Sequence, residues 1–275
     1  MTFFQSIIMG IVEGLTEYLP ISSTGHLYLA SQILGIGKSQ YAQEAVNAYS
    51  ICIQLGAILA VTSLYSNRLK QIAKGIAGKE PNGRKLATNL LVAFTPAVVA
   101  GLAFEKMIKS HLFGLWPIAI AWIVGGFVIL LLSKFRPSAQ ASKDGCNLEG
   151  LTLKQAATVG CAQCVAMWPG VSRSLATIVG AMLAGVSMSA AVEFSFLLGF
   201  ITLGTATLYE ALKCGHLIIA MFGWLNPLVG LITAYVSAVL AIKWMVSYIN
   251  KRGMNGFGYY RLALGFFVII MLIKK

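Results

Sequence analysis

Long apolar stretches separated by short polar segments dominate this chain of 275 residues. A helix needs about 20 apolar residues to cross the hydrocarbon core of a bilayer. Six stretches approach that length, and they cover residues 45–66, 88–104, 113–133, 190–212, 224–246 and 259–273. The pattern therefore predicts six transmembrane spans and an all-α polytopic membrane protein.

Two further apolar stretches, residues 3–36 and 153–187, are interrupted by Pro, Gly and Ser. Non-helical backbone at membrane depth is tolerated only where it is buried in protein or lines a wet cavity. We therefore expect two re-entrant hairpins of broken helices, whose polar residues lie at helix ends inside the membrane.

The two halves of the chain also resemble each other. Without gaps, Gly10-x-x-Glu13 aligns on Gly160-x-x-Gln163, and residues 20–24 align on residues 170–174. Each half, approximately 1–135 and 150–275, holds one broken hairpin and three spans. Because three is odd, the second half must enter the membrane upside down. This predicts an inverted-topology repeat within a single integral membrane domain (1–275), with a site where the repeats meet.

Composition and charge agree with a membrane protein. Only 11% of the residues are charged, whereas soluble domains carry about 25%. The net charge is +12, but the basic residues are spread between apolar segments, which argues against nucleic-acid binding. Residues 67–87 hold six of them and residues 134–154 hold four. The positive-inside rule places both segments in the cytoplasm and both chain ends outside.

The N-terminal segment is expected to belong to the mature fold. Residues 1–15 have neither a basic n-region nor an Ala-x-Ala cleavage site, so they do not resemble a removable signal peptide.

Three other features favour structural roles. Cys161-Ala-Gln-Cys164 spells a redox or zinc motif, but no second Cys/His pair lies nearby, so we expect it to pack within a helix. His111 and His216 fall near segment ends, where we expect them at the membrane interface. Glu193 begins a span, and the sequence does not decide whether it supports the site or is a helix N-terminal charge.

The first interrupted stretch carries acids followed by hydroxyls. Glu13 and Glu17 are one helical turn apart. Two carboxylates this close in a low dielectric favour a raised pKa for one of them, or a divalent cation bound between them. The next polar run contains Ser23, Thr24 and His26, whose hydroxyls and backbone N–H groups suit an anion. A hydroxyl beside a carboxylate or His can be an activated nucleophile. The pattern does not choose between Ser23 and His26.

The second interrupted stretch has the composition of a phosphate cradle. A planar guanidinium and the N–H groups of a helix N-terminus both bind phosphate oxygens. The candidate residues are Gly170, Ser172, Arg173, Ser174 and Thr177. Plainer interpretations are that the hydroxyls bond back to helix carbonyls, or that Arg173 only pairs with a Glu to hold the halves together.

These two motifs closely resemble those of the bacterial undecaprenyl pyrophosphate phosphatases of the bacitracin-resistance type. The matching runs are residues 10–26 and 168–177, with lesser matches at 54–58 and 193–198. The resemblance implies hydrolysis of undecaprenyl pyrophosphate to undecaprenyl phosphate and inorganic phosphate. It also implies a multi-pass protein of the bacterial plasma membrane, whose site faces the periplasm and uses a divalent metal, Mg²⁺ or Ca²⁺.

Carried onto this chain, the family's catalytic roles fall on Glu13, Glu17, Ser23, His26 and Arg173. Glu13 and Glu17 are the expected metal ligands. Thr24 joins the residues of the second motif in binding the phosphates, and Ser23 is expected to attack with Glu17 or His26 as base. Expected partners are the lipid substrate, membrane lipids and a second copy in a homodimer.

Three positions depart from the family pattern, namely Leu175, Ser50 and Ile201. A rival interpretation also stands, because inverted repeats with broken helices are typical of secondary transporters. On that hypothesis the same acids and Arg173 bind an anion or a proton, or flip a lipid phosphate, without breaking a bond.

Overall fold

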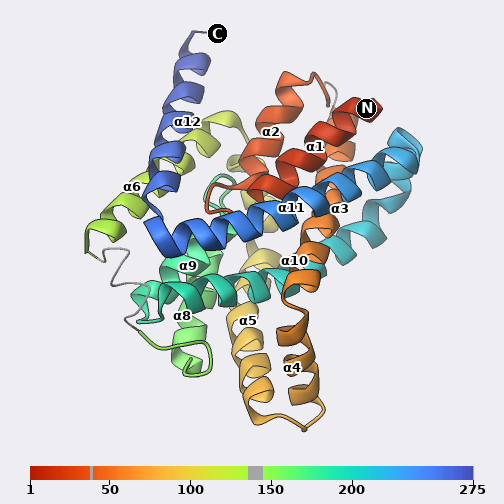
Figure 1. Cartoon of the computed structure of the whole chain (residues 1–275). Helices are drawn as coiled ribbons and strands as arrows, with labels where there is room; N and C mark the ends of the chain where they lie inside the picture. The colour runs from red at the N-terminus through yellow and green to blue at the C-terminus, as the bar shows by residue number, and fades with distance from the viewer. Residues whose placement is uncertain (38–39, 136–144, 275) are drawn as a thin grey trace.

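The computed structural model describes residues 1–37, 40–135 and 145–274, and all regular elements in these ranges are helices (Figure 1). They are α1 (Phe3–Thr16), α2 (Ser23–Ile33), α3 (Gln40–Leu64), α4 (Ser66–Ile76), α5 (Pro81–His111), α6 (Leu115–Phe135), α8 (Leu153–Val165), α9 (Arg173–Leu183), α10 (Met188–Phe222), α11 (Leu225–Arg252) and α12 (Asn255–Ile273). The all-α prediction is confirmed.

Six of the described helices are long and apolar enough to cross a membrane, and each contains most or all of a predicted span. These are α3, α5, α6, α10, α11 and α12. The predicted loop at 67–87 is instead largely helical, because it contains α4 and the first turns of α5. Residues 136–144 of the second predicted basic segment lie outside the described residues.

Each interrupted stretch folds into two short helices joined by a turn, α1–α2 and α8–α9, and the two pairs are built alike. Thr2 and Thr152 cap α1 and α8 in the same way, each in a capping box with the Gln three residues later. The two Gln side chains then reach matching carbonyls: Gln5 Nε2 donates to Leu34 O at 3.1 Å, and Gln155 Nε2 to Ala184 O at 2.9 Å. Each Gln thereby ties the start of its helix pair to the end.

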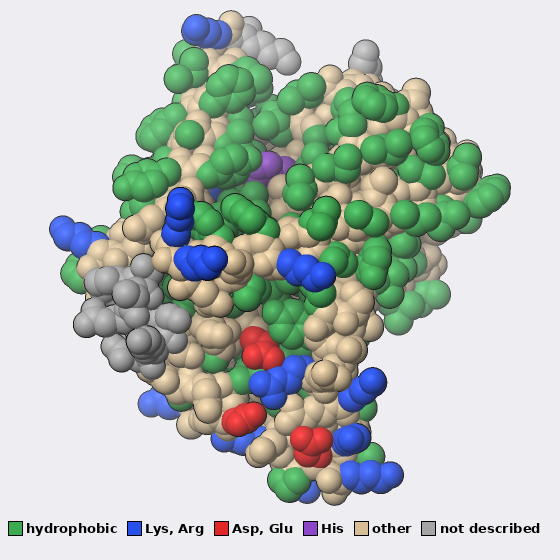
Figure 2. All heavy atoms as spheres, in the orientation of Figure 1, with side chains coloured by type: hydrophobic (Ala, Val, Ile, Leu, Met, Phe, Trp, Pro, Cys, Tyr) green, Lys and Arg blue, Asp and Glu red, His purple; other side chains and the backbone are tan. Residues whose placement is uncertain are grey.

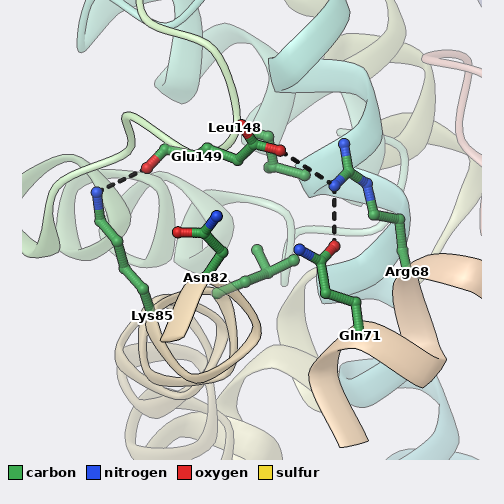
Figure 3. A pocket seen from close by; sticks show the side chains of 7 residues that line it. Arg68, Gln71, Asn82, Lys85, Leu148 and Glu149 are labelled. Carbon is green, nitrogen blue, oxygen red and sulfur yellow. Dashed lines mark hydrogen bonds and ion pairs between the residues drawn. The ribbon is translucent and has the colours of Figure 1, made fainter. Parts of the chain in front are cut away.

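On the visible face, the acidic side chains and many of the basic ones lie toward one end of the molecule (Figure 2). Lys and Arg gather where α4 and α5 protrude, while hydrophobic side chains cover most of the visible face above (Figure 2). Arg68 of α4 pairs with Glu193 of α10 at 2.7 Å and with Glu149 at 3.5 Å, and Lys85 Nζ donates to Glu149 O at 2.7 Å (Figure 3). The hydrogen bond to Glu193 is the main cause that raises the pKa of Arg68. Glu193 therefore links α10 to α4.

Candidate active site

The turns of the two helix pairs meet in the interior of the protein. Ser174 Oγ donates to Leu19 O at 2.8 Å, and Ser172 Oγ lies 3.4 Å from the same carbonyl. Leu19 belongs to the turn between α1 and α2, so hydroxyls of the second motif bind the backbone of the first. Residues that are distant in the sequence thus form one site.

Three predicted residues form the centre of this site. Glu17 caps the C-terminus of α1, whereas Ser23 and Arg173 are the first residues of α2 and α9. Arg173 Nη2 lies 3.1 Å from Glu17 Oε1, and Ser23 Oγ donates a hydrogen bond to Glu17 Oε2. The Glu17 and Arg173 side chains are only 4% and 12% exposed. One buried carboxylate therefore joins a hydroxyl to a guanidinium.

Residues that the motif analysis did not select hold Arg173 and Glu17 in place. Arg173 Nη1 donates to Ser195 O on α10 at 2.9 Å, and its guanidinium carbon lies 5.2 Å from the centre of the Tyr18 ring. Gln54 of α3 reaches Glu17 Oε2 at 3.4 Å. Tyr18 lies inside the first motif and Gln54 inside a lesser match. Their place in these runs was the only feature of the sequence that could have assigned them to the site.

Several buried polar atoms in the described chain have no hydrogen-bond partner. They are both carboxylate oxygens of Glu13, the Tyr18 hydroxyl, the Gln163 amide, Asn89 Oδ1 and Arg173 Nε. An unsatisfied buried group costs about 1–3 kcal/mol. Gln163 occupies the repeat position of Glu13, so both halves keep an unpartnered side chain there. Such groups are suited to a bound ligand, ion or water.

Glu13 fits the predicted role of metal ligand. It is fully buried, both of its oxygens are unpartnered, and carboxylate oxygens are the ligands that Mg²⁺ and Ca²⁺ prefer. Within the described residues, no group of three or more His, Cys, Asp or Glu side chains is placed to bind a metal. Glu13 and Glu17 would therefore have to share the ion with water or with substrate oxygens.

The hydroxyls of the second motif are mainly occupied within the protein. Ser172 and Ser174 lie 2.9 Å apart, and Ser172 Oγ also accepts the Leu175 N–H at the start of α9. Thr177 Oγ1 donates to Arg173 O at 2.8 Å and contacts Ser195 Oγ at 2.7 Å. These bonds fix the turn, and a phosphate must bind in addition to them or displace some of them.

Three other predicted residues lie at the edge of this cluster. His26 contacts Ser22 O through Nδ1 at 2.7 Å and the Tyr260 hydroxyl through Nε2 at 2.8 Å. Its ring therefore faces α12, and its two ring nitrogens contact Ser22 and Tyr260 rather than Ser23 or Glu17. Thr24 is exposed at the start of α2, and the Gly170 carbonyl accepts a hydrogen bond from Arg261.

Arg261 is the main feature that sequence reasoning missed. It is fully buried in α12 and donates only to backbone carbonyls. An ionisable residue inside a transmembrane span is rare and costly, and that rule alone could have identified it as a candidate. Arg261 belongs to neither motif and lies within the predicted span 259–273.

The arrangement can support phosphoryl transfer. A carboxylate beside a hydroxyl can accept its proton, and a guanidinium can stabilise charge on phosphate oxygens. Glu17 is buried and Arg173 is largely shielded from solvent, and a low dielectric strengthens their interactions with a bound anion.

Comparisons with known proteins lead to one family. The family model described as bacitracin resistance protein BacA matches residues 6–267. A Sorangium cellulosum protein named undecaprenyl-diphosphatase is 43% identical over 273 residues, which cover 98% of this chain and 86% of that relative. Undecaprenyl-diphosphatase 2 of Rhodospirillum rubrum is 42% identical, with 96% and 93% covered. An undecaprenyl-diphosphatase of Herminiimonas arsenicoxydans is 42% identical, with the same coverage.

Proposed function

The chain belongs to the bacitracin resistance protein BacA family, and we propose that it hydrolyses undecaprenyl pyrophosphate to undecaprenyl phosphate and inorganic phosphate. The relatives are named for this activity. The observation that carries the proposal is the buried cluster in which Glu17 joins Ser23 to Arg173. The product is the lipid carrier of cell-wall synthesis, so its recycling accounts for bacitracin resistance.

The chemistry follows from the contacts of Glu17. Ser23 attacks the terminal phosphorus, its proton passes to Glu17, and the bond between that phosphorus and the bridging oxygen breaks. Undecaprenyl phosphate leaves, and water then cleaves the phosphoserine to release inorganic phosphate. Arg173 stabilises the developing charge on the phosphate oxygens. Because His26 faces Tyr260, the geometry favours Glu17 over His26 as the base for Ser23.

Glu13 and Glu17 would hold a Mg²⁺ or Ca²⁺ ion, whose charge would neutralise the diphosphate. The unpartnered oxygens of Glu13 support this assignment. Arg173 pairs with Glu17, so an incoming phosphate competes with Glu17 for the guanidinium. That exchange would release Glu17 Oε1 from the ion pair, while Oε2 keeps the hydrogen bond from Ser23 through which the proton would pass.

The finer architecture is part of the same proposal. The two helix pairs are re-entrant hairpins of an inverted repeat, supported by their matching caps and turns. The charged end around α4 and α5 faces the cytoplasm of a bacterial inner membrane, supported by its basic residues. The catalytic site opens to the periplasmic side. A homodimer and specifically bound membrane lipids also stay predictions.

Phosphate release by the purified protein tests the function. With undecaprenyl pyrophosphate in detergent micelles, the wild type is expected to release phosphate. Glu17→Gln removes the base and is expected to lower kcat by about 10²–10⁴-fold. The matched control is Glu44→Gln, at an exposed position of α3. A wild type that moves its substrate across liposomes without cleaving it would contradict the proposal and favour the transporter.

A further inference from the structure

A single buried arginine, Arg261, connects the two catalytic turns. Its Nη1 donates to Pro20 O at 3.2 Å, and its Nη2 donates to Gly170 O at 2.9 Å. Pro20 lies between Glu17 and Ser23, and Gly170 comes three residues before Arg173. The guanidinium therefore holds, through backbone carbonyls, the segment with the base and nucleophile and the segment with the phosphate-binding cation.

The same guanidinium is fastened to α6. Nη2 also donates to Ala121 O at 2.8 Å, and Nε donates to Trp122 O at 3.3 Å. These bonds fix the fork of donors from three directions. Gly125 makes room for it, because a Cβ at that position would lie 2.7 Å from Arg261 Cζ. Four carbonyls accept from its buried donors, and two of those carbonyls, Pro20 O and Gly170 O, belong to the catalytic turns.

The helices α6 and α12 pack against each other and bind the catalytic turns as a pair. Trp122 Nε1 of α6 donates to Ile21 O in the first turn at 2.9 Å, and Trp168 Nε1 before the second turn donates to Pro117 O of α6 at 3.1 Å. The Ser172 and Ser174 hydroxyls join the two turns directly through Leu19 O. Arg261 adds a second link, which also fastens both turns to α6.

We propose that Arg261 is a positioning residue, which sets the separation of Ser23 and Arg173 on the substrate phosphate without touching the substrate. This inference depends on the proposed function. Binding of the prenyl tail comes from apolar burial elsewhere, so a change in turn spacing acts on the chemical step. A misplacement of about 1 Å in a catalytic group can cost about 10²-fold in rate.

Two variants disturb the contacts of Arg261 with the turns, one by changing Arg261 and the other by changing the glycine packed against it. Arg261→Lys keeps the charge but replaces the planar fork of donors with a single ammonium, which cannot reach all four carbonyls. Gly125→Ala keeps Arg261 and displaces its guanidinium through the added Cβ. Gly204→Ala is the matched control, because nothing lies within 4 Å of a Cβ at that position.

The test measures kcat and KM for undecaprenyl pyrophosphate per folded molecule, with monodispersity and melting temperature recorded for each variant. We expect kcat to fall by about 10–10²-fold in both variants, KM to stay within about threefold of the wild type, and Gly204→Ala to match the wild type. If Arg261→Lys does not fold, Gly125→Ala tests the positioning role by itself. If Gly125→Ala does not fold, Arg261→Lys does.

Unchanged kcat in a folded variant would overturn the positioning role, and so would equal losses in kcat and in substrate affinity. If neither variant gave a folded protein, Arg261 would be a residue of general stability and the proposal would fail. If the wild type releases phosphate and the variants do so equally well, only the positioning role of Arg261 is contradicted. A wild type that releases no phosphate removes the proposed function as well.

Discussion

At the scale of residues, the site depends on the planar geometry of the Arg173 guanidinium. One nitrogen, Nη2, pairs with Glu17 and another, Nη1, holds the Ser195 carbonyl, while Nε stays unpartnered. A phosphate can therefore approach an edge of the fork that already has one free donor. Positive charge alone would not supply this geometry.

Replacing Arg173 by Lys tests that geometry. The substitution keeps the charge but loses the second oriented donor, so we expect kcat to fall by about 10²–10³-fold. The measurement is phosphate release at saturating substrate. Arg252→Lys, at the exposed end of α11, serves as control and should match the wild type. Near wild-type turnover of Arg173→Lys would mean that charge is sufficient.

The central residues of the site were predictable from the sequence. Glu17, Ser23 and Arg173 were selected because acids, hydroxyls and a cation are costly at membrane depth, and the structure brings these three together. The orientation of His26 toward Tyr260 was not predictable, because the partner comes from the far end of the chain. Arg261 was missed because it lies in an otherwise apolar span.

At the scale of elements, α2 and α9 begin with the same unusual backbone. Ser22 has φ 72° and Ser172 has φ 78°, and these are the only non-glycine residues with positive φ in the described chain. The conformation costs a residue with a Cβ roughly 1 kcal/mol relative to Gly. It turns the chain sharply, so that Ser23 and Arg173 begin their helices directly at the meeting point.

The two serines differ in what their side chains do, and this gives a stability prediction. The Ser22 side chain makes no capping bond, whereas Ser172 Oγ accepts the Leu175 N–H and contacts Ser174. Ser22→Gly should therefore raise stability by about 1 kcal/mol by relieving strain. Ser172→Gly should show no gain, because loss of the cap offsets the relief. Melting temperatures measured in one detergent compare the two.

A higher melting temperature for Ser172→Gly than for Ser22→Gly would contradict this account. So would a destabilised Ser22→Gly. Ser22→Val provides the opposite check, since a β-branched residue at positive φ should lower the melting temperature of the same preparation.

Hydropathy predicted the elements well and the connections less well. All six spans correspond to long described helices, because length and apolarity alone define a crossing. The helix α4 was not predicted, because its sequence is basic and polar, and its ion pair with Glu193 depends on a residue from the second half. Such tertiary contacts leave no periodic signal in the sequence.

At the scale of the whole molecule, the two motifs come together because each half of the chain places a similar helix pair at the same point in the interior. The helix pairs α1–α2 and α8–α9 share their capping boxes and their closing Gln bonds, and their turns meet through Leu19 O. The two halves differ in their chemistry. The first supplies acids and a nucleophile, whereas the second keeps the neutral Gln163 and supplies Arg173.

The central claim is that this meeting point is a hydrolytic site in which Ser23 attacks the terminal phosphate. Phosphate release by purified Ser23→Ala tests it most directly, with Ser63→Ala, at an exposed position of α3, as the matched control. We expect Ser23→Ala to lose about 10²–10⁴-fold in kcat while it stays folded, and Ser63→Ala to keep wild-type turnover. Wild-type turnover by a folded Ser23→Ala protein would contradict the claim.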